Sequence, residues 1–218
     1  MTDPTQALLN SPTLPRHVER LRRVLDDEAA RRARFVDEIQ PHEKGEFING
    51  EIVMASPALH RHNLVSSRLA NLLGAYILDR GLGVLVFEKA MVSLTRNDYE
   101  PDLAFFDRDA AAELTGDTLR YPAPDLAVEI LSPSSEQRDR GVKFEDYAAH
   151  GVTEYWIVDP DVETVEQYVL GDGEDEYTLR MKSATGELAS VAVEGFAVPV
   201  RALFDDAANV AALRALLA

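Results

Sequence analysis

Two acidic residues stand in segments whose other residues are typical of buried β-strands. Asp102 directly precedes the apolar run at residues 103–106, and Glu129 lies inside the apolar run at residues 126–131. A carboxylate in a buried strand costs free energy unless it is paired, hydrogen-bonded or bound to a cation. We therefore expect Asp102 and Glu129 to lie on neighbouring strands, with their carboxylates close enough to share one cation.

The amino-acid composition restricts the kind of cation that this pair can hold. The chain has no cysteine among its 218 residues, which excludes disulfides and thiolate metal sites. Mg²⁺ and Mn²⁺ prefer the hard oxygen ligands that two carboxylates supply. The two acids thus predict a Mg²⁺ or Mn²⁺ site and favour a metal-dependent hydrolase.

The charge balance limits how the chain can bind nucleic acid. It carries 38 acidic residues against 22 Lys and Arg, for a formal net charge of −16. DNA affinity rests largely on cations that neutralise phosphates, so tight and salt-tolerant DNA binding by this chain alone is not expected. A nuclease of this composition needs divalent ions and a local basic rim to offset the overall field.

The apolar segments are short. No apolar run approaches the roughly 18 residues needed to span a bilayer, and the first residues lack the basic and apolar regions of a signal peptide. We therefore expect a cytoplasmic protein with no membrane segment. At this length the chain is predicted to form one domain with a modest arm.

That arm is predicted at residues 1–40, ahead of a main domain at residues 41–218. Val18, Leu21 and Leu25 recur at helical spacing among dense charges, within a predicted helix at residues 15–39. Such an amphipathic helix packs either on its own domain or on a second subunit.

The main domain is predicted to be α/β, with a mixed sheet of about six to eight strands and helices on its faces. Ser56 is a candidate N-cap for a helix that Pro57 opens, and an Asn-Gly turn centres the first hairpin. The predicted strands lie at residues 46–54 (a hairpin), 84–87, 91–94, 103–106, 126–131, 155–158, 162–170, 177–181 and 190–193. The predicted helices lie at residues 57–83, 134–150 and 209–217.

One predicted helix carries three functional side chains on a single face. Asp139, Lys143 and Tyr147 are each four residues from the next, which aligns them along the helix. If the strand that contains Glu129 leads directly into this helix, the face can overlie that glutamate. The alternative is a surface ion pair between Asp139 and Lys143, with Tyr147 packed at the edge.

These motifs together resemble a known nuclease superfamily. Pro101-Asp102, the later Glu129 and a nearby lysine are similar to the PD-(D/E)XK nucleases. More closely, the chain resembles the Uma-two family of restriction-endonuclease-like proteins over roughly residues 40–200. The segments that carry this resemblance are residues 47–51 (FINGE), 62–63 (HN), 101–102 (PD), 129–134 (EILSPS), 138–147 (RDRGVKFEDY) and 151–160 (GVTEYWIVDP).

The resemblance implies a restriction-endonuclease-like fold and Mg²⁺-dependent hydrolysis of phosphodiester bonds. Asp102, Glu129 and the backbone carbonyl of Ile130 would bind the metal ion. The usual lysine of the superfamily lies two residues after the strand glutamate, where this chain has Leu131. Lys143 is therefore assigned as a lysine relocated to the following helix, because its long side chain can still reach the site.

Four further residues are candidates for supporting roles. Glu51 is a third candidate acid, and His62 is a candidate contact to phosphate or to metal-bound water. Asp139 and Tyr147 share the helical face of Lys143. The alternatives are an exposed strand glutamate at residue 51 and an ordinary helix-face histidine at residue 62.

Two other functions compete with a nuclease that acts on DNA in preference to RNA. One is a catalytically weak or inactive nuclease-fold module for protein interaction or dimerisation, which the acidic balance and the displaced lysine favour. The other is a metal-dependent hydrolase of a small phosphorylated substrate, although the chain lacks a phosphate-cradling glycine loop.

We also expect a homodimer. The charged arm and Tyr155-Trp156 are predicted to supply spare amphipathic surface, and two-fold pairing suits cleavage of two antiparallel strands.

Overall fold

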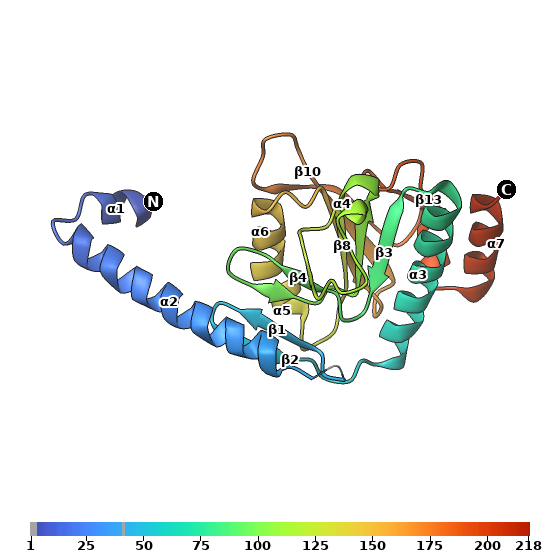
Figure 1. Cartoon of the computed structure of the whole chain (residues 1–218). Coiled ribbons are helices and arrows are strands. Elements are labelled where there is room, and N and C mark those ends of the chain that lie inside the picture. Colours follow the sequence, from blue (N-terminus) through green and yellow to red (C-terminus); the bar gives the residue numbers. More distant parts are fainter. Residues whose placement is uncertain (1–3, 41) are drawn as a thin grey trace.

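The chain folds into an α/β structure whose main element is a mixed sheet of six strands. A computed structural model describes residues 4–40 and 42–218 (Figure 1). Strands β8 and β9 of this sheet are parallel, whereas the other neighbouring pairs are antiparallel. In spatial order the strands are β11 (Tyr177–Ser183), β10 (Thr164–Leu170), β9 (Glu154–Asp159), β8 (Leu126–Ile130), β6 (Leu103–Asp107) and β3 (Gly83–Phe87).

The remaining strands form two smaller sheets. The five-stranded sheet has the order β2 (Glu51–Met54), β1 (Gly45–Ile48), β5 (Asp98–Tyr99), β4 (Met91–Ser93) and β7 (Arg120–Tyr121), and β12 (Glu187–Ala189) pairs with β13 (Ala197–Pro199). The predicted α/β class is confirmed. The expected mixed sheet of about six to eight strands is confirmed by the six-stranded sheet, whereas the first hairpin pairs with β5 and stays outside that sheet.

The prediction of a strand at residues 190–193 is wrong. This segment instead turns around the carboxylate of Glu154, which accepts hydrogen bonds from the backbone N–H groups of Val191 and Ala192 at 2.8 and 2.9 Å. A buried carboxylate thus takes the backbone donors that a strand would have used.

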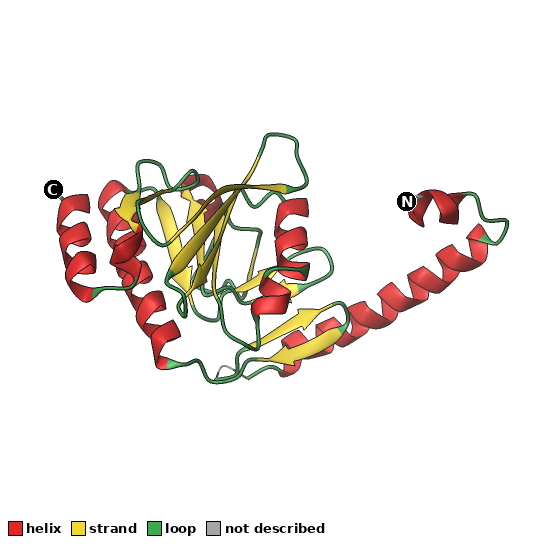
Figure 2. Ribbon diagram, turned by 180° about the vertical axis from the view of Figure 1, so that it is seen from behind, coloured by secondary structure: helices red, strands yellow, loops and turns green. Residues whose placement is uncertain are grey.

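The helices cover the sheets and form the arm (Figure 2). They are α1 (Pro4–Leu9), α2 (Leu14–Glu38), α3 (His60–Arg80), α4 (Arg108–Ala112), α5 (Glu136–Asp139), α6 (Val142–Ala149), the 3₁₀ turn η1 (Val200–Leu203) and α7 (Asp206–Leu216). Within residues 4–40 and 42–218, no helix is both long and apolar enough to cross a membrane.

Two predicted helix boundaries are corrected. The third helix begins at His60 with Leu59 as its N-cap, so Ser56 and Pro57 lie in the preceding irregular segment. The helix predicted at residues 134–150 is divided into α5 and α6, because Gly141 leaves helical geometry at φ −119° and ψ −104°. A Cβ atom at that position would lie 2.8 Å from the carbonyl oxygen of Gln137, which explains why glycine suits the break.

The alternation of side chains along the central strands places both predicted acids on one face. Leu103 and Val128 are paired across β6 and β8 and contribute to the core under α3. Their neighbours Asp102 and Glu129 therefore point to the opposite face, since successive strand residues alternate. The antiparallel register also sets these two acids across from each other. The position of the acids follows from the strand pairing alone.

The arm is anchored at only one end (Figures 1 and 2). Phe35 packs against Phe47 of β1, and the guanidinium of Arg32 donates to both carboxylate oxygens of Asp98 at 2.6 Å. The earlier turns of α2 project away from the domain. Tyr155 and Trp156 are fully buried in the core, so the spare surface predicted there is wrong.

Candidate active site

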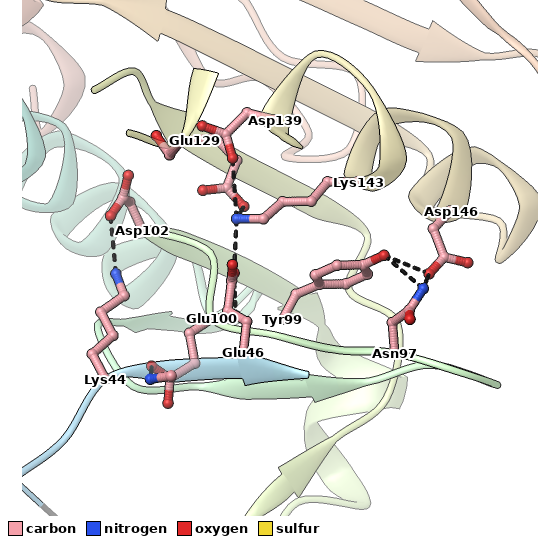
Figure 3. Close-up of polar contacts among 12 residues, drawn as sticks. Lys44, Glu46, Asn97, Tyr99, Glu100, Asp102, Glu129, Asp139, Lys143 and Asp146 are labelled. Atoms are coloured by element: carbon pink, nitrogen blue, oxygen red, sulfur yellow. Dashed lines mark hydrogen bonds and ion pairs between the residues drawn. The ribbon is translucent and has the colours of Figure 1, made fainter. Parts of the chain in front are cut away.

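Four buried carboxylates gather beside one cavity of about 700 Å³. Glu46 comes from β1, Glu100 follows β5, Asp102 precedes β6, and Glu129 belongs to β8. All four side chains belong to buried residues, and all four line the cavity. The hairpin and the large sheet thus contribute acids to the same site (Figure 3).

Lys143 lies at the centre of these acids. Its Nζ atom is 2.7 Å from Glu46, 3.0 Å from Glu129 and 3.1 Å from Asp139 (Figure 3). The lysine is 3% exposed, and Asp139 is fully buried. The alternative of a surface pair between Asp139 and Lys143 is therefore wrong, because α6 turns this face toward the sheet. The attraction of three carboxylates outweighs the effect of burial and raises the pKa of Lys143 well above its usual value.

Asp102 is held from three directions. Its Oδ2 accepts a hydrogen bond from the backbone N–H of Ile130 at 2.8 Å and lies 3.1 Å from Nε2 of His62. Its Oδ1 accepts from Nζ of Lys44 at 3.2 Å. Burial alone would raise the pKa of this carboxyl group, but His62, Lys44 and the Ile130 N–H together lower it to about 2. Asp102 is therefore charged at neutral pH.

The pKa values of two other carboxyl groups are shifted upward. Burial raises the pKa of Glu129 well above its usual value despite the opposing effect of Lys143, and the nearby carboxylates of Asp139, Asp102 and Glu46 raise it further. Burial likewise raises the pKa of Glu100 to about 7. Carboxyl groups whose charged forms are disfavoured by burial and by neighbouring acids mark a site that an added cation would stabilise.

The donor chemistry of the cluster fits a hard divalent ion. Its candidate ligands are carboxylate oxygens and the Ile130 carbonyl, and Oδ2 of Asp139 is buried without a hydrogen-bond partner among the described residues. Across residues 4–40 and 42–218, no three His, Asp or Glu side chains are already grouped as a metal centre. The ammonium groups of Lys44 and Lys143 lie between the carboxylates instead.

Tyr147 and a second polar network fix α6 in place. The Tyr147 hydroxyl donates to Oε1 of Glu129 at 3.4 Å, and its ring packs edge-on against Tyr99. The preceding residue, Asp146, accepts hydrogen bonds from Asn97 and Tyr99, both at 2.7 Å (Figure 3). These contacts tie the helix that carries Lys143 to the five-stranded sheet.

The structure brings together most of the predicted site residues and leaves one apart. Asp102, Glu129, Lys143, Asp139, Tyr147 and His62 all contact the cluster directly or through one partner. Glu51 does not, because it is exposed on β2 and lines a separate hollow with Arg31 and Arg34.

Three residues of the cluster are missing from the sequence prediction. Glu46 stands in an apolar strand beside Phe47 and Ile48, which is the same signal that identified Asp102 and Glu129. Glu100 directly precedes the Pro101-Asp102 motif. Lys44 offered no such signal, because it lies in an irregular segment just before β1.

A comparison with protein families identifies the family of this chain. A model of the Uma2 family, described as "Putative restriction endonuclease", matches residues 32–201. The chain belongs to the Uma2 family. The matched region contains all the acids and both lysines that form the cluster.

Two proteins of Synechocystis sp. are similar in sequence to this chain. An uncharacterized protein of Synechocystis sp. is 31% identical over 172 residues, which cover 75% of this chain and 85% of the relative. A second uncharacterized Synechocystis protein is 29% identical over 134 residues, which cover 60% of this chain and 75% of the relative.

A solved structure shares the fold. It is a crystal structure from Anabaena variabilis, described as "a putative nuclease belonging to DUF820". It aligns with a TM-score of 0.67 at 18% identity, covering 78% of this chain and 94% of that chain. Together these findings confirm the predicted Uma2 membership and the restriction-endonuclease-like fold.

Proposed function

We propose that this Uma2 protein is a Mg²⁺-dependent endonuclease, with Mn²⁺ as an alternative ion, that hydrolyses phosphodiester bonds. The observation that carries this proposal is the placement of Asp102 and Glu129 on antiparallel neighbours, with both buried carboxylates beside one cavity. Buried acids with shifted pKa values in a cavity are the usual mark of a chemical site. The family description supports nucleic acid as the substrate, with DNA favoured over RNA.

Each residue of the cluster has a proposed role. Asp102, Glu129 and the Ile130 carbonyl would hold the divalent ion. Such an ion, when bound, lowers the pKa of a water molecule and neutralises phosphoryl oxygens. Lys143 would orient the attacking water or stabilise the negative charge that develops on the phosphoryl group.

Three further residues would maintain this arrangement. Asp139 contacts the Lys143 ammonium at 3.1 Å, and the Tyr147 hydroxyl donates to Glu129. His62 contacts Oδ2 of Asp102 at 3.1 Å, which would orient that carboxylate. A homodimer and a cytoplasmic location belong to the same proposal.

A catalytically weak or inactive module for protein interaction or dimerisation is the alternative function. One observation favours it: α2 leaves Leu21, Val24 and Leu25 between 42% and 51% exposed on the projecting arm. Apolar side chains in a row on a projecting helix are typical of a partner surface.

Two substitutions test the proposal against this alternative. Asp102→Asn and Glu129→Gln should each lose Mn²⁺ binding, measured by calorimetry, together with cleavage of plasmid DNA. Glu187→Gln, which changes an exposed acid on β12, should alter neither property. Cleavage at the wild-type rate by both Asp102→Asn and Glu129→Gln would contradict the proposed metal site.

A further inference from the structure

The two carboxylate oxygens of Asp102 differ in what they can still bind. Oδ2 already contacts the Ile130 N–H at 2.8 Å and His62 Nε2 at 3.1 Å, which uses both of its lone pairs. Oδ1 accepts a hydrogen bond from Lys44 at 3.2 Å. A metal ion would therefore reach Asp102 through Oδ1, which is the position that the Lys44 ammonium occupies.

Lys44 and Lys143 differ in their freedom to move. The Lys143 side chain is 3% exposed and contacts three carboxylates. The Lys44 side chain is 31% exposed, and it forms an ion pair with Asp102. A lysine stem is long and flexible, so its ammonium can shift while the backbone stays still.

The backbone at Lys44 is fixed by the hairpin. Its carbonyl oxygen accepts a hydrogen bond from the Ala55 N–H at 2.9 Å, immediately beyond the end of β2. The Lys44 ammonium is therefore tethered at the cavity wall, within reach of Asp102 but not locked there. Any group that displaces it from Oδ1 leaves a positive charge beside the same cavity.

Two cations cannot share Oδ1 without strong repulsion, because like charges a few ångströms apart repel when water is partly excluded. Lys44 and a divalent ion should therefore compete for Asp102. Once displaced, the ammonium needs a new anionic partner. Because the Lys44 side chain is 31% exposed at the cavity wall, the phosphate of a substrate that enters the cavity would lie within its reach and supply one.

We propose that Lys44 is a movable cation of the active site. Its ammonium holds Oδ1 of Asp102 when no divalent ion is bound, and it transfers to the nonbridging oxygens of the substrate phosphate when the ion takes Oδ1. This inference rests on the proposed function and assigns to Lys44 a contact with the substrate phosphate, in addition to the role proposed for Lys143.

The test is the effect of Lys44→Met on Mn²⁺ affinity, measured by calorimetry on the full chain. Removing a competing ammonium should tighten Mn²⁺ binding by about 3- to 10-fold, the range expected for loss of a partly exposed ion pair. Plasmid cleavage at saturating Mn²⁺ should fall by about 100-fold, because a charge that stabilises the phosphoryl group is lost. Lys44→Arg, which keeps the charge, should retain near-wild-type Mn²⁺ affinity.

Lys182→Met is the matched control. Lys182 is also ion-paired with a buried glutamate, at 3.1 Å from Glu166, but it lies outside the cavity. This variant should keep both Mn²⁺ affinity and cleavage. Thermal unfolding of each variant should show that it is folded at the assay temperature.

Three other results would contradict the proposal or part of it. Unchanged or weaker Mn²⁺ binding in Lys44→Met would overturn the competition while leaving the proposed metal site intact. Wild-type cleavage by that variant at saturating Mn²⁺ would overturn the phosphate contact. If neither the wild-type chain nor Lys44→Met binds Mn²⁺, both the proposed function and this inference fail.

Discussion

At the scale of single residues, the enclosure of Lys143 by three carboxylates governs both stability and chemistry. Its Nζ atom lies within 3.1 Å of Glu46, Glu129 and Asp139, so its removal leaves three acids facing one another. Had Lys143 been one half of an exposed pair, its loss would change the free energy of unfolding by only about 0–1 kcal/mol. Because Lys143 is buried, the small free-energy change of an exposed pair does not apply to it.

We therefore expect Lys143→Ala to lower the free energy of unfolding by about 3–5 kcal/mol, because a buried charge network loses its only central cation. Urea unfolding at pH 7 measures this change, with Lys182→Ala as a control on an exposed lysine that should cost about 0–1 kcal/mol. Cleavage should be abolished while Mn²⁺ affinity stays near that of the wild type, since an ammonium is not a ligand. Cleavage at the wild-type rate by folded Lys143→Ala would contradict the proposal that Lys143 serves as the relocated lysine of the site.

Glu166 provides a pH-dependent contribution far from the cavity. Burial raises its pKa, but hydrogen bonds from Arg140, Tyr168 and Lys182 lower it overall to about 2, against an ordinary value of 4.5. A carboxyl group with a lowered folded-state pKa stabilises the fold above its unfolded pKa and loses that effect as pH falls. The contribution should be complete above about pH 5 and disappear toward pH 2.

The measurement is the free energy of unfolding between pH 2 and pH 6 for the wild type and Glu166→Gln. The variant should be less stable at pH 6 by on the order of 2 kcal/mol, since one pKa unit corresponds to about 1.4 kcal/mol. The two curves should converge at low pH. A constant gap across the whole range would show that Glu166 acts by packing and not by its charge.

At the scale of elements, α2 and its C-cap carry two apolar pairs at matching positions, separated by the charged residues Glu28 and Arg32. Phe35 and Ile39 at its C-terminal end pack against the domain, whereas Leu21 and Leu25 at matching positions remain about 50% exposed. The four-residue spacing within each pair is one of those used in helix pairing. The exposed pair leads us to propose a second copy of the arm as its partner.

We predict that the full chain is a homodimer and that Leu21→Glu combined with Leu25→Glu makes it monomeric, because charges replace the apolar stripe. Light scattering at high micromolar concentration measures the mass of each form. Leu78→Glu is the control, since Leu78 is 82% exposed on α3 and lies away from the arm. A wild-type monomer at that concentration would contradict the prediction.

The elements also show how far the sequence could be read without a structure. Continuous apolar runs identified the strands of Asp102 and Glu129, and the two acids were expected on neighbouring strands, as the pairing of β6 with β8 confirms. The break between α5 and α6 was not visible, because a single glycine inside a helical pattern is compatible with continuation. The location of Glu46 depends on a hairpin that crosses to another sheet, and such long-range pairing leaves no local signal.

At the scale of the whole molecule, the net charge of −16 sets the conditions under which nucleic acid can bind. Phosphate neutralisation supplies most non-specific affinity, and the cavity lining has no surplus of Lys and Arg over Asp and Glu. Without a divalent ion, the buried carboxylates should repel a phosphate. We therefore expect a duplex to bind more weakly than about micromolar at physiological salt in the presence of EDTA.

A divalent ion bound in the cavity should offset part of this repulsion, whereas ions near the rest of the surface should not. Fluorescence anisotropy of a labelled duplex should show tighter binding when Ca²⁺ or Mg²⁺ is added to the wild type, but not to Asp102→Asn, because that variant lacks the carboxylate that would hold the ion. Raising the salt concentration should weaken both proteins, since all phosphate contacts are screened. Nanomolar binding in EDTA would mean that a basic surface on the arm, and not the acidic cavity, is what attracts the nucleic acid.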